Sequence, residues 1–295
     1  IEEVYRVIEI LESIGVSVKW LDQNSVLITP PKKFNLENIN KESATMTRSV
    51  IMLVGPLIHM LPSFSLPHAQ GCSLGRRTIA AHTYALEELG IKIKTTNASY
   101  EISATKFKPA DIVMYETGET ACENVLFASA LIDGATTISF MSNNYMVQEI
   151  CFFLETLGVK IDGVGTSTLT VHGLKEINKN VEYWNSEDPI ESMMFISAGI
   201  ITDSHITITR CPIDFLALEL EKMKRMGQKY KILKKYHSYN GRTKLADIEI
   251  FPGKLKALQD KIHANIYPGI NIDNLPFFVP IAIKANGQTM IHDWY

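Results

Sequence analysis

Cysteine is scarce in this sequence, and its arrangement excludes two kinds of protein. None of the cysteines stands in a CxxC pair, and no His/Cys group has zinc-ligand spacing. This pattern is not typical of a disulfide scaffold or of a zinc centre. It favours free thiols in a reducing compartment such as the cytoplasm. The sequence as a whole implies neither a metal nor an organic cofactor. The 295 residues contain four cysteines, which are Cys72, Cys122, Cys151 and Cys211.

Long hydrophobic runs and an excess of one charge are also missing. No apolar run reaches the roughly 18 residues that span a bilayer. The formal net charge is −3, so the sequence gives no sign of a nucleic-acid or membrane partner. With 46% hydrophobic and 21% charged residues, the composition is that of a globular protein with length for one large core or two smaller ones.

Repetition is the main feature that the sequence does contain. Several amphipathic helical patterns end at a glycine and give way to a strand. Glycine suits the left-handed position just after a helix, so each repeat predicts a helix end. The recurring text is Leu11-Glu12-Ser13-Ile14-Gly15-Val16, Leu86-Glu87-Glu88-Leu89-Gly90-Ile91 and Leu154-Glu155-Thr156-Leu157-Gly158-Val159, with a further copy ending at Gly227.

A second repeated pattern consists of an apolar helix, a small polar turn and a strand. The helices carry few charges on any face, so we expect them to be buried, with the amphipathic helices outside. They cover Val125–Ile132, Met193–Ile201 and Phe277–Ile283. The two patterns recur together with a period of roughly 70 residues, which is longer than the periods of solenoid repeats. The pattern predicts an α/β fold of repeated units around shared helices.

A composition change near Tyr183–Pro189 is the best candidate for a domain boundary. It predicts one domain over residues 1–187 and a partial second domain over residues 188–295. The chain begins inside a helical pattern and ends within an expected strand. We therefore expect it to be part of a longer protein, and the oligomeric state stays open, a monomer included.

A glycine-flanked cysteine is the strongest candidate for chemistry. Within His68–His82, Cys72 lies between two glycines, and two arginines follow four and five residues later. A helical pattern begins at once. Guanidinium groups and a helix N-terminus both favour a thiolate, and together they also form an anion site. The alternative is an inert thiol in a glycine-rich turn beside solvated arginines.

Two further segments open apolar helices. Arg48 stands at the start of a helix that runs through Leu53 to Leu57. An arginine there opposes the helix macrodipole, as expected if it faces an anionic ligand, although a surface arginine is the alternative. In Glu116–Asn124, Thr and Gly residues leave backbone N–H groups free for a ligand. Capping by Thr117 or Thr120 is the alternative.

Two aspartates also precede apolar helices. Asp188, with Glu191 three residues later, favours a helix N-terminus charged in the stabilising sense, although a site residue is possible by position. Asp273 lies in a loop bounded by Pro268 and Pro276. A carboxylate there could act as a general base for a hydroxyl, and a helix cap is the alternative.

These residues together resemble UDP-N-acetylglucosamine 1-carboxyvinyltransferases, which are enolpyruvyl transferases. Arg48 to Leu57 is similar to that family's Arg-Ala-Ser-…-Gly-Pro-Leu segment, and Leu66 to His82 resembles its Leu-Pro-Gly-Gly-Cys-x-Ile-Gly-x-Arg-Pro-Val-Asp-Leu-His loop. Ala121-Cys122-Glu123-Asn124 resembles Ala-Thr-Glu-Asn, and Pro268 to Asp273 resembles the Pro-x-Phe-Pro-Thr-Asp loop. Ile291-His292-Asp293-Trp294 is similar to the family's strand that follows the next helix after this loop. The resemblance covers essentially the whole chain.

The resemblance implies an inside-out α/β barrel of two domains, each built of βαβαββ units, with the second domain incomplete here. It also implies transfer of the enolpyruvyl group of phosphoenolpyruvate to the 3-hydroxyl of UDP-N-acetylglucosamine, with release of phosphate, for peptidoglycan synthesis. Cys72 would be the general acid and covalent partner, and Asp273 the base. The implied substrate-binding residues are Arg48, Arg77, Thr78, Ile79, Ala80, Ala81, Tyr115, Glu116, Thr117, Gly118, Glu119, Thr120, Asp188 and Tyr295.

Departures from the family text leave rival functions open. The family has Pro-Val-Asp-Leu where this chain has Thr78 to Ala81, and Ser-Val-Gly where it has Gly118 to Thr120. Its Ala-Arg-Glu-Pro-Glu segment is Ser142 to Met146 here. One rival is the sister enzyme 5-enolpyruvylshikimate-3-phosphate synthase. Another is a non-catalytic member that binds a nucleotide sugar. Because the family's Lys-Asn pair and distal arginines lie outside this chain, we expect the chain alone to be inactive.

Overall fold

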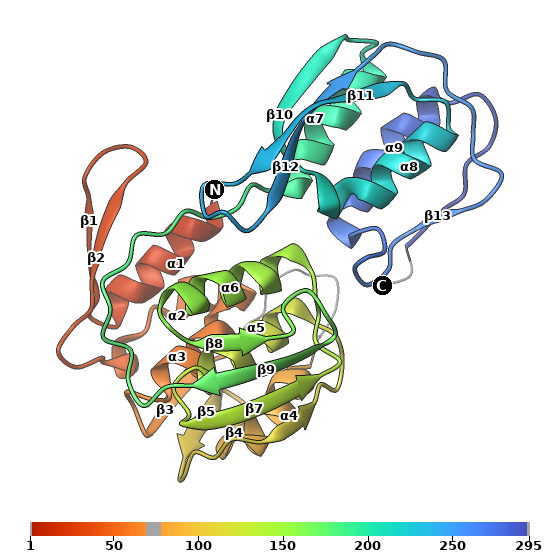
Figure 1. The fold of residues 1–295 in the computed structure, drawn as a ribbon. Helices are drawn as coiled ribbons and strands as arrows, with labels where there is room; N and C mark the ends of the chain where they lie inside the picture. The colour runs from red at the N-terminus through yellow and green to blue at the C-terminus, as the bar shows by residue number, and fades with distance from the viewer. Residues whose placement is uncertain (1, 69–77, 294–295) are drawn as a thin grey trace. The chain divides into compact units, whose positions relative to one another are not determined.

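The computed structural model describes residues 2–68 and 78–293 (Figure 1). These residues form two compact units. The first unit contains residues 1–142 and 157–179, and the second contains residues 143–156 and 180–295. Among the described residues, no helix combines the length and the apolar character that crossing a membrane requires.

The first unit alternates helices with short strands. Its helical segments are α1 (Glu2–Ser13), η1 (Leu36–Asn38), α2 (Lys41–Met46), η2 (Arg48–Leu53), α3 (Val54–Leu57), α4 (Ala80–Glu88) and α5 (Glu119–Ser129). Its strands are β1 (Ser17–Trp20), β2 (Val26–Thr29), β3 (Ser63–Pro67), β4 (Ile91–Thr95), β5 (Ser99–Ala104), β6 (Asp111–Val113), β7 (Gly134–Ser139), β8 (Lys160–Asp162) and β9 (Thr168–Gly173).

The second unit repeats this alternation. Its helical segments are α6 (Tyr145–Thr156), α7 (Pro189–Ile201), η3 (Ile213–Leu216), α8 (Ala217–Arg225), η4 (Ile272–Asn274) and α9 (Leu275–Lys284). Its strands are β10 (Ile206–Pro212), β11 (Tyr230–His237), β12 (Lys244–Ile250), β13 (Ile262–His263) and β14 (Ile291–His292).

The sheets confirm the internal repeat. A strand, a helix and a hairpin follow one another in the sequence, and the last strand pairs between the other two. This gives the orders β3-β5-β4 and β10-β12-β11, and the same arrangement recurs as β7-β9-β8 within the sheet β6-β7-β9-β8. β1 pairs with β2, and β13 pairs with β14. The predicted α/β class is therefore confirmed.

The repeated glycines end helices as their positions predict. Gly15, Gly90, Gly158 and Gly227 all have positive φ, between 90° and 104°. Gly90 also approaches another backbone closely, because a Cβ there would lie 2.2 Å from the carbonyl oxygen of Lys106. A side chain at this position would strain the backbone and would also collide with the loop that follows β5.

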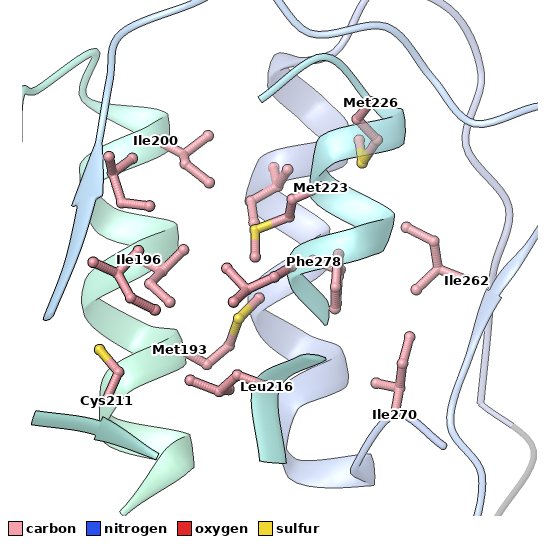
Figure 2. Packing of buried hydrophobic residues seen from close by; sticks show 14 of the residues in the cluster. Met193, Ile196, Ile200, Cys211, Leu216, Met223, Met226, Ile262, Ile270 and Phe278 are labelled. Atoms are coloured by element: carbon pink, nitrogen blue, oxygen red, sulfur yellow. The ribbon is translucent and has the colours of Figure 1, made fainter. Parts of the chain in front are cut away.

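Burial of the apolar helices is confirmed for α5 and only partly for α7 and α9. In the second unit, α7, α8 and α9 pack around Met193, Met223 and Phe278, as Figure 2 shows. Other residues of α7 and α9 remain exposed, among them Phe195, Val279 and Ile283. The expectation of full burial is wrong for these two helices, because one face of each has no covering element within the described part of the unit.

The two units do not follow the order of the repeats. α6 belongs to the second unit although its sequence neighbours belong to the first. Contacts within the second unit explain this, because Glu149 of α6 accepts hydrogen bonds from the hydroxyl of Tyr183 at 2.7 Å and the N–H of Ser186 at 2.9 Å. The predicted domain boundary between residues 187 and 188 stays a prediction.

Candidate functional site

Four helical segments of the first unit meet at the buried side chain of Asn124. Asn124 has no exposed surface. Its Oδ1 accepts a hydrogen bond from the N–H of Gly55 at 2.6 Å, and its Nδ2 donates to the carbonyl of Ile51 at 2.9 Å. The same Nδ2 lies 3.2 Å from Nδ1 of His82. One amide therefore links α5 to η2, α3 and α4.

The link joins the first turn of α4 to the middle of α5 and of η2. Ile51 lies in η2, which begins at Arg48, and His82 lies in the first turn of α4. Asn124 itself lies in the middle of α5. The sequence predicts a single apolar helix from Arg48, and the structure instead has a 3₁₀ segment followed by α3. Thr47 caps this segment by accepting a hydrogen bond from the N–H of Ser49.

Gly55 allows the close approach of α3 to α5. A Cβ at this position would lie 2.5 Å from the carbonyl oxygen of Asn124 and 2.9 Å from Cβ of Phe127. A second bond between these elements joins Nε2 of His59, just after α3, to the carbonyl of Ala128 at 2.7 Å. Burial lowers the pKa of His59, so the neutral ring donates this hydrogen bond.

Neutral His82 fits the same network with its proton on Nε2. Because Nδ2 of Asn124 is a donor, Nδ1 of His82 acts as the acceptor. His82 is buried and lies directly after Thr78–Ala81, the segment predicted to bind substrate. Thr78 is exposed, and its hydroxyl lies 3.5 Å from the N–H of Ala80 at the start of α4. The bond to His82 thus connects Asn124 to that predicted segment.

The turn at 115–120 lies beside α4. The ring of Tyr115 meets the ring of Tyr84 edge to face, with centroids 5.2 Å apart. The N-cap of α5 is Gly118, which has no side chain to accept a hydrogen bond. Capping by Thr117 or Thr120 is therefore not what the structure has, because the residue at the cap position makes no side-chain hydrogen bond to the first turn of α5.

Two acidic residues in the N-terminal half of α5 repel one another electrostatically. Glu119 and Glu123 are four residues apart on the same helix. Burial, and then the nearby charge of Glu119, raises the pKa of the Glu123 carboxyl to about 7. Glu123 thus stays partly protonated near neutral pH and adds little negative charge to a site for anions.

The second unit contains the two aspartates. Oδ1 of Asp188 accepts a hydrogen bond from the N–H of Ile190 at 2.8 Å and caps α7, with Pro189 in the first turn. The predicted helix N-terminus, charged in the stabilising sense, is thus confirmed at Asp188. Asp273 is exposed within η4, and the cap of that segment is Asn271, which accepts from the N–H of Asp273 at 2.9 Å. The capping alternative is therefore wrong for Asp273.

Several predicted residues lie outside the part of the chain that the structure describes. These are Cys72, Arg77 and Tyr295, and the side chain of Arg48 belongs with them. The structure thus groups Thr78–Ala81 with Tyr115–Thr120 in one unit and places Asp188 and Asp273 in the other. Their roles in binding and catalysis stay predictions.

The cysteines in the described part of the chain are buried, and none of them forms a disulfide. Burial raises the pKa of the Cys122 thiol to about 12 and that of Cys211 to about 11. Neither forms a thiolate at neutral pH, so neither is a candidate nucleophile. Within the described ranges, no group of three His, Cys, Asp or Glu side chains has the geometry to hold a metal ion.

Residues 1–293 match the sequence family described as EPSP synthase (3-phosphoshikimate 1-carboxyvinyltransferase). The chain belongs to this family. Among solved structures, the enolpyruvyl transferase NikO from Streptomyces tendae has a TM-score of 0.79 at 19% identity, covering 100% of this chain and 67% of that chain. EPSP synthase from Acinetobacter baumannii has a TM-score of 0.68 at 17% identity, covering 97% and 64%. The predicted enolpyruvyl-transferase fold is confirmed.

Relatives within the family carry the name that the sequence motifs suggest. The UDP-N-acetylglucosamine 1-carboxyvinyltransferase of Campylobacter hominis is 29% identical over 99% of this chain and 67% of its own length. That of Bradyrhizobium diazoefficiens is 31% identical over 77% of this chain and 52% of its own length. The chain thus spans about two thirds of the first relative and about half of the second. The resemblance stated from the motifs is confirmed.

Sequence reasoning missed the residues that hold the site together. Asn124 stands in the Ala-Cys-Glu-Asn text that carries the resemblance, but periodicity assigns it no role. Gly55 and His82 likewise stand in family-like text. A polar residue inside an otherwise apolar helix was the available signal, because a buried amide needs several partners.

Proposed function

We propose that the full-length protein transfers the enolpyruvyl group of phosphoenolpyruvate to the 3-hydroxyl of UDP-N-acetylglucosamine and releases phosphate. The observation that carries this proposal is the linkage of η2, α3, α4 and α5 through Asn124, which holds the N-terminus of α4, with the segment Thr78–Ala81, against α5. Helix N-termini favour anions, and both substrates are anionic. The names of the relatives supply the acceptor and the reaction.

The proposed roles follow the grouping of residues in each unit. Thr78–Ala81 and Tyr115–Thr120 bind the nucleotide sugar in the first unit. Arg48 and Arg77 bind the phosphate and carboxylate of phosphoenolpyruvate. Asp188 and Tyr295 complete the binding residues.

Chemistry requires one acid and one base. Cys72 donates a proton to the methylene carbon of phosphoenolpyruvate, and the 3-hydroxyl oxygen bonds to the adjacent carbon while Asp273 accepts its proton. The Cys72 thiolate then takes a proton back from the methyl carbon as the C–O bond to phosphate breaks, which restores the double bond, and the proton on Asp273 leaves with phosphate or to water. We place this reaction in the cytoplasm, where it would supply peptidoglycan synthesis and hence cell-wall growth and division.

Phosphate release tests the proposal. The full-length protein is assayed with phosphoenolpyruvate plus UDP-N-acetylglucosamine, and in parallel with shikimate 3-phosphate, because the family description names that second acceptor. Cys72→Ala should abolish release, whereas Cys211→Ala, which replaces a buried thiol, should not. Release only with shikimate 3-phosphate would assign the sister activity. No release with either acceptor would refute the transferase proposal and favour a binding protein.

A further inference from the structure

A buried carboxyl group is hydrogen-bonded to the segment that carries Asp273. Glu219, in the first turn of α8, is 2% exposed. Nδ2 of Asn274 donates a hydrogen bond to its Oε1 at 2.9 Å, and Asn274 is itself fully buried. Among the described residues, Glu219 forms no salt bridge. Burial of a carboxyl group without an ion-pair partner is costly, so its hydrogen bonds to the segment that carries Asp273 are the contacts that offset this cost.

Asp273 stands between two asparagines that fix its backbone. On one side, Oδ1 of Asn271 accepts from the N–H of Asp273. On the other side, the N–H of Asn274 donates to the carbonyl of Asn271 at 3.0 Å, closing the 3₁₀ turn. Neighbouring residues in a 3₁₀ segment point about 120° apart. Anchoring Asn274 inward on α8 therefore directs Asp273 outward, where it is exposed.

We propose that Glu219 is a positioning residue for Asp273 and acts through the buried side chain of Asn274. This inference rests on the proposed function, in which Asp273 accepts the hydroxyl proton. Without the bond to Glu219, Asn274 has no anchor in α8 and η4 can rotate. A small displacement of a base from its substrate lowers the rate of proton transfer strongly.

The neutral form of Glu219 suits this position best. Burial raises the pKa of its carboxyl, and hydrogen bonds from the side chain of Asn274 and from the backbone of Glu219 and Asn271 partly oppose the shift. Oδ1 of Asn274 is buried without a partner, and a protonated carboxyl has the donor that this atom lacks. Glutamine is also neutral, with one acceptor and a donor, so Glu219→Gln should preserve the anchor.

The test measures kcat and both KM values in the full-length protein, in the wild-type and the Asp273→Asn backgrounds. Asp273→Asn alone should lower kcat at least about 100-fold. Glu219→Leu should lower kcat about tenfold with both KM values little changed, and Glu219→Gln should keep kcat within about twofold of wild type. In the Asp273→Asn background, Glu219→Leu should have no further effect.

Gln228→Leu is the matched control. Gln228 is a buried polar residue of the same unit, and its Nε2 donates to the carbonyls of Lys229 and Phe251, away from η4. Its loss should lower the melting temperature without lowering kcat. If Glu219→Leu does not fold, Asn274→Ala removes the same hydrogen bond and has the same expected result.

Three outcomes would overturn the inference. If Glu219→Leu lowers kcat by the same factor in the wild-type and the Asp273→Asn proteins, Glu219 has a general structural role and does not act through Asp273. An unchanged kcat in a folded Glu219→Leu variant would show that the anchor is not needed. An unchanged kcat in Asp273→Asn would instead refute the base role of Asp273, which separates failure of the proposed function from failure of the positioning role.

Discussion

Asn124→Ala should destabilise the first unit by about 2–4 kcal/mol. The N–H of Gly55 would lose the acceptor that lies 2.6 Å away, and leaving a buried donor unpaired costs about 1–3 kcal/mol. The carbonyl of Ile51 would lose one partner but would keep the N–H of Val54, so this loss is nearer to about 1 kcal/mol. The sum gives the stated range.

Urea unfolding and amide hydrogen exchange of the full-length protein would measure this effect. Exchange in peptides covering residues 48–57 should rise, because the Gly55 amide loses its acceptor. Ser129→Ala is the matched control in α5. The Ser129 hydroxyl donates only to Val125 and Leu126 of its own helix, so its removal should cost less than about 1 kcal/mol.

Equal stability of Asn124→Ala and Ser129→Ala would refute the argument that Asn124 holds the helices together. Unchanged exchange at residues 48–57 would refute it too, even if global stability fell. An effect confined to α5 would mean that the contacts to η2 and α3 contribute little.

Three further predictions concern other local features. Gly55→Ala should destabilise the first unit by about 1–3 kcal/mol in urea titration, because its Cβ would collide with Asn124, and wild-type stability would contradict this. The pKa of Glu123 is raised from 4.5 to about 7. Its contribution to the free energy of unfolding is therefore complete below pH 4.5 and is lost as pH rises through 7, and the free energy of unfolding should fall by at most about 3 kcal/mol across this window. Glu123→Gln should remove this pH dependence between pH 5 and 8, and an identical slope in both proteins would refute it. Arg210 has φ of 61°, so thermal melting should show Arg210→Gly to be more stable than Arg210→Ala by about 1 kcal/mol, and the reverse order would count against strain there.

Local chemistry made much of the fold predictable. The glycines that end helices were identified from their own neighbours, because the left-handed conformation is a property of single residues. Apolar runs likewise indicated α5 and α7. Asp188 and Asp273 stand in similar sequence contexts, yet only Asp188 is a cap. The difference is local too, since Asn271 takes the capping position ahead of Asp273.

The sequence by itself determined the repeat, the fold family and the segments that carry the candidate chemistry, because these follow from periodicity, turn residues and motif text. Only the tertiary structure decided which polar side chains hold those segments in place. Asn124 bonds to residues 69 and 73 positions earlier, and Asn274 bonds to a residue 55 positions earlier. Nothing in a local pattern indicates such a partner, because a buried amide or carboxyl is satisfied by groups that the chain brings together only on folding.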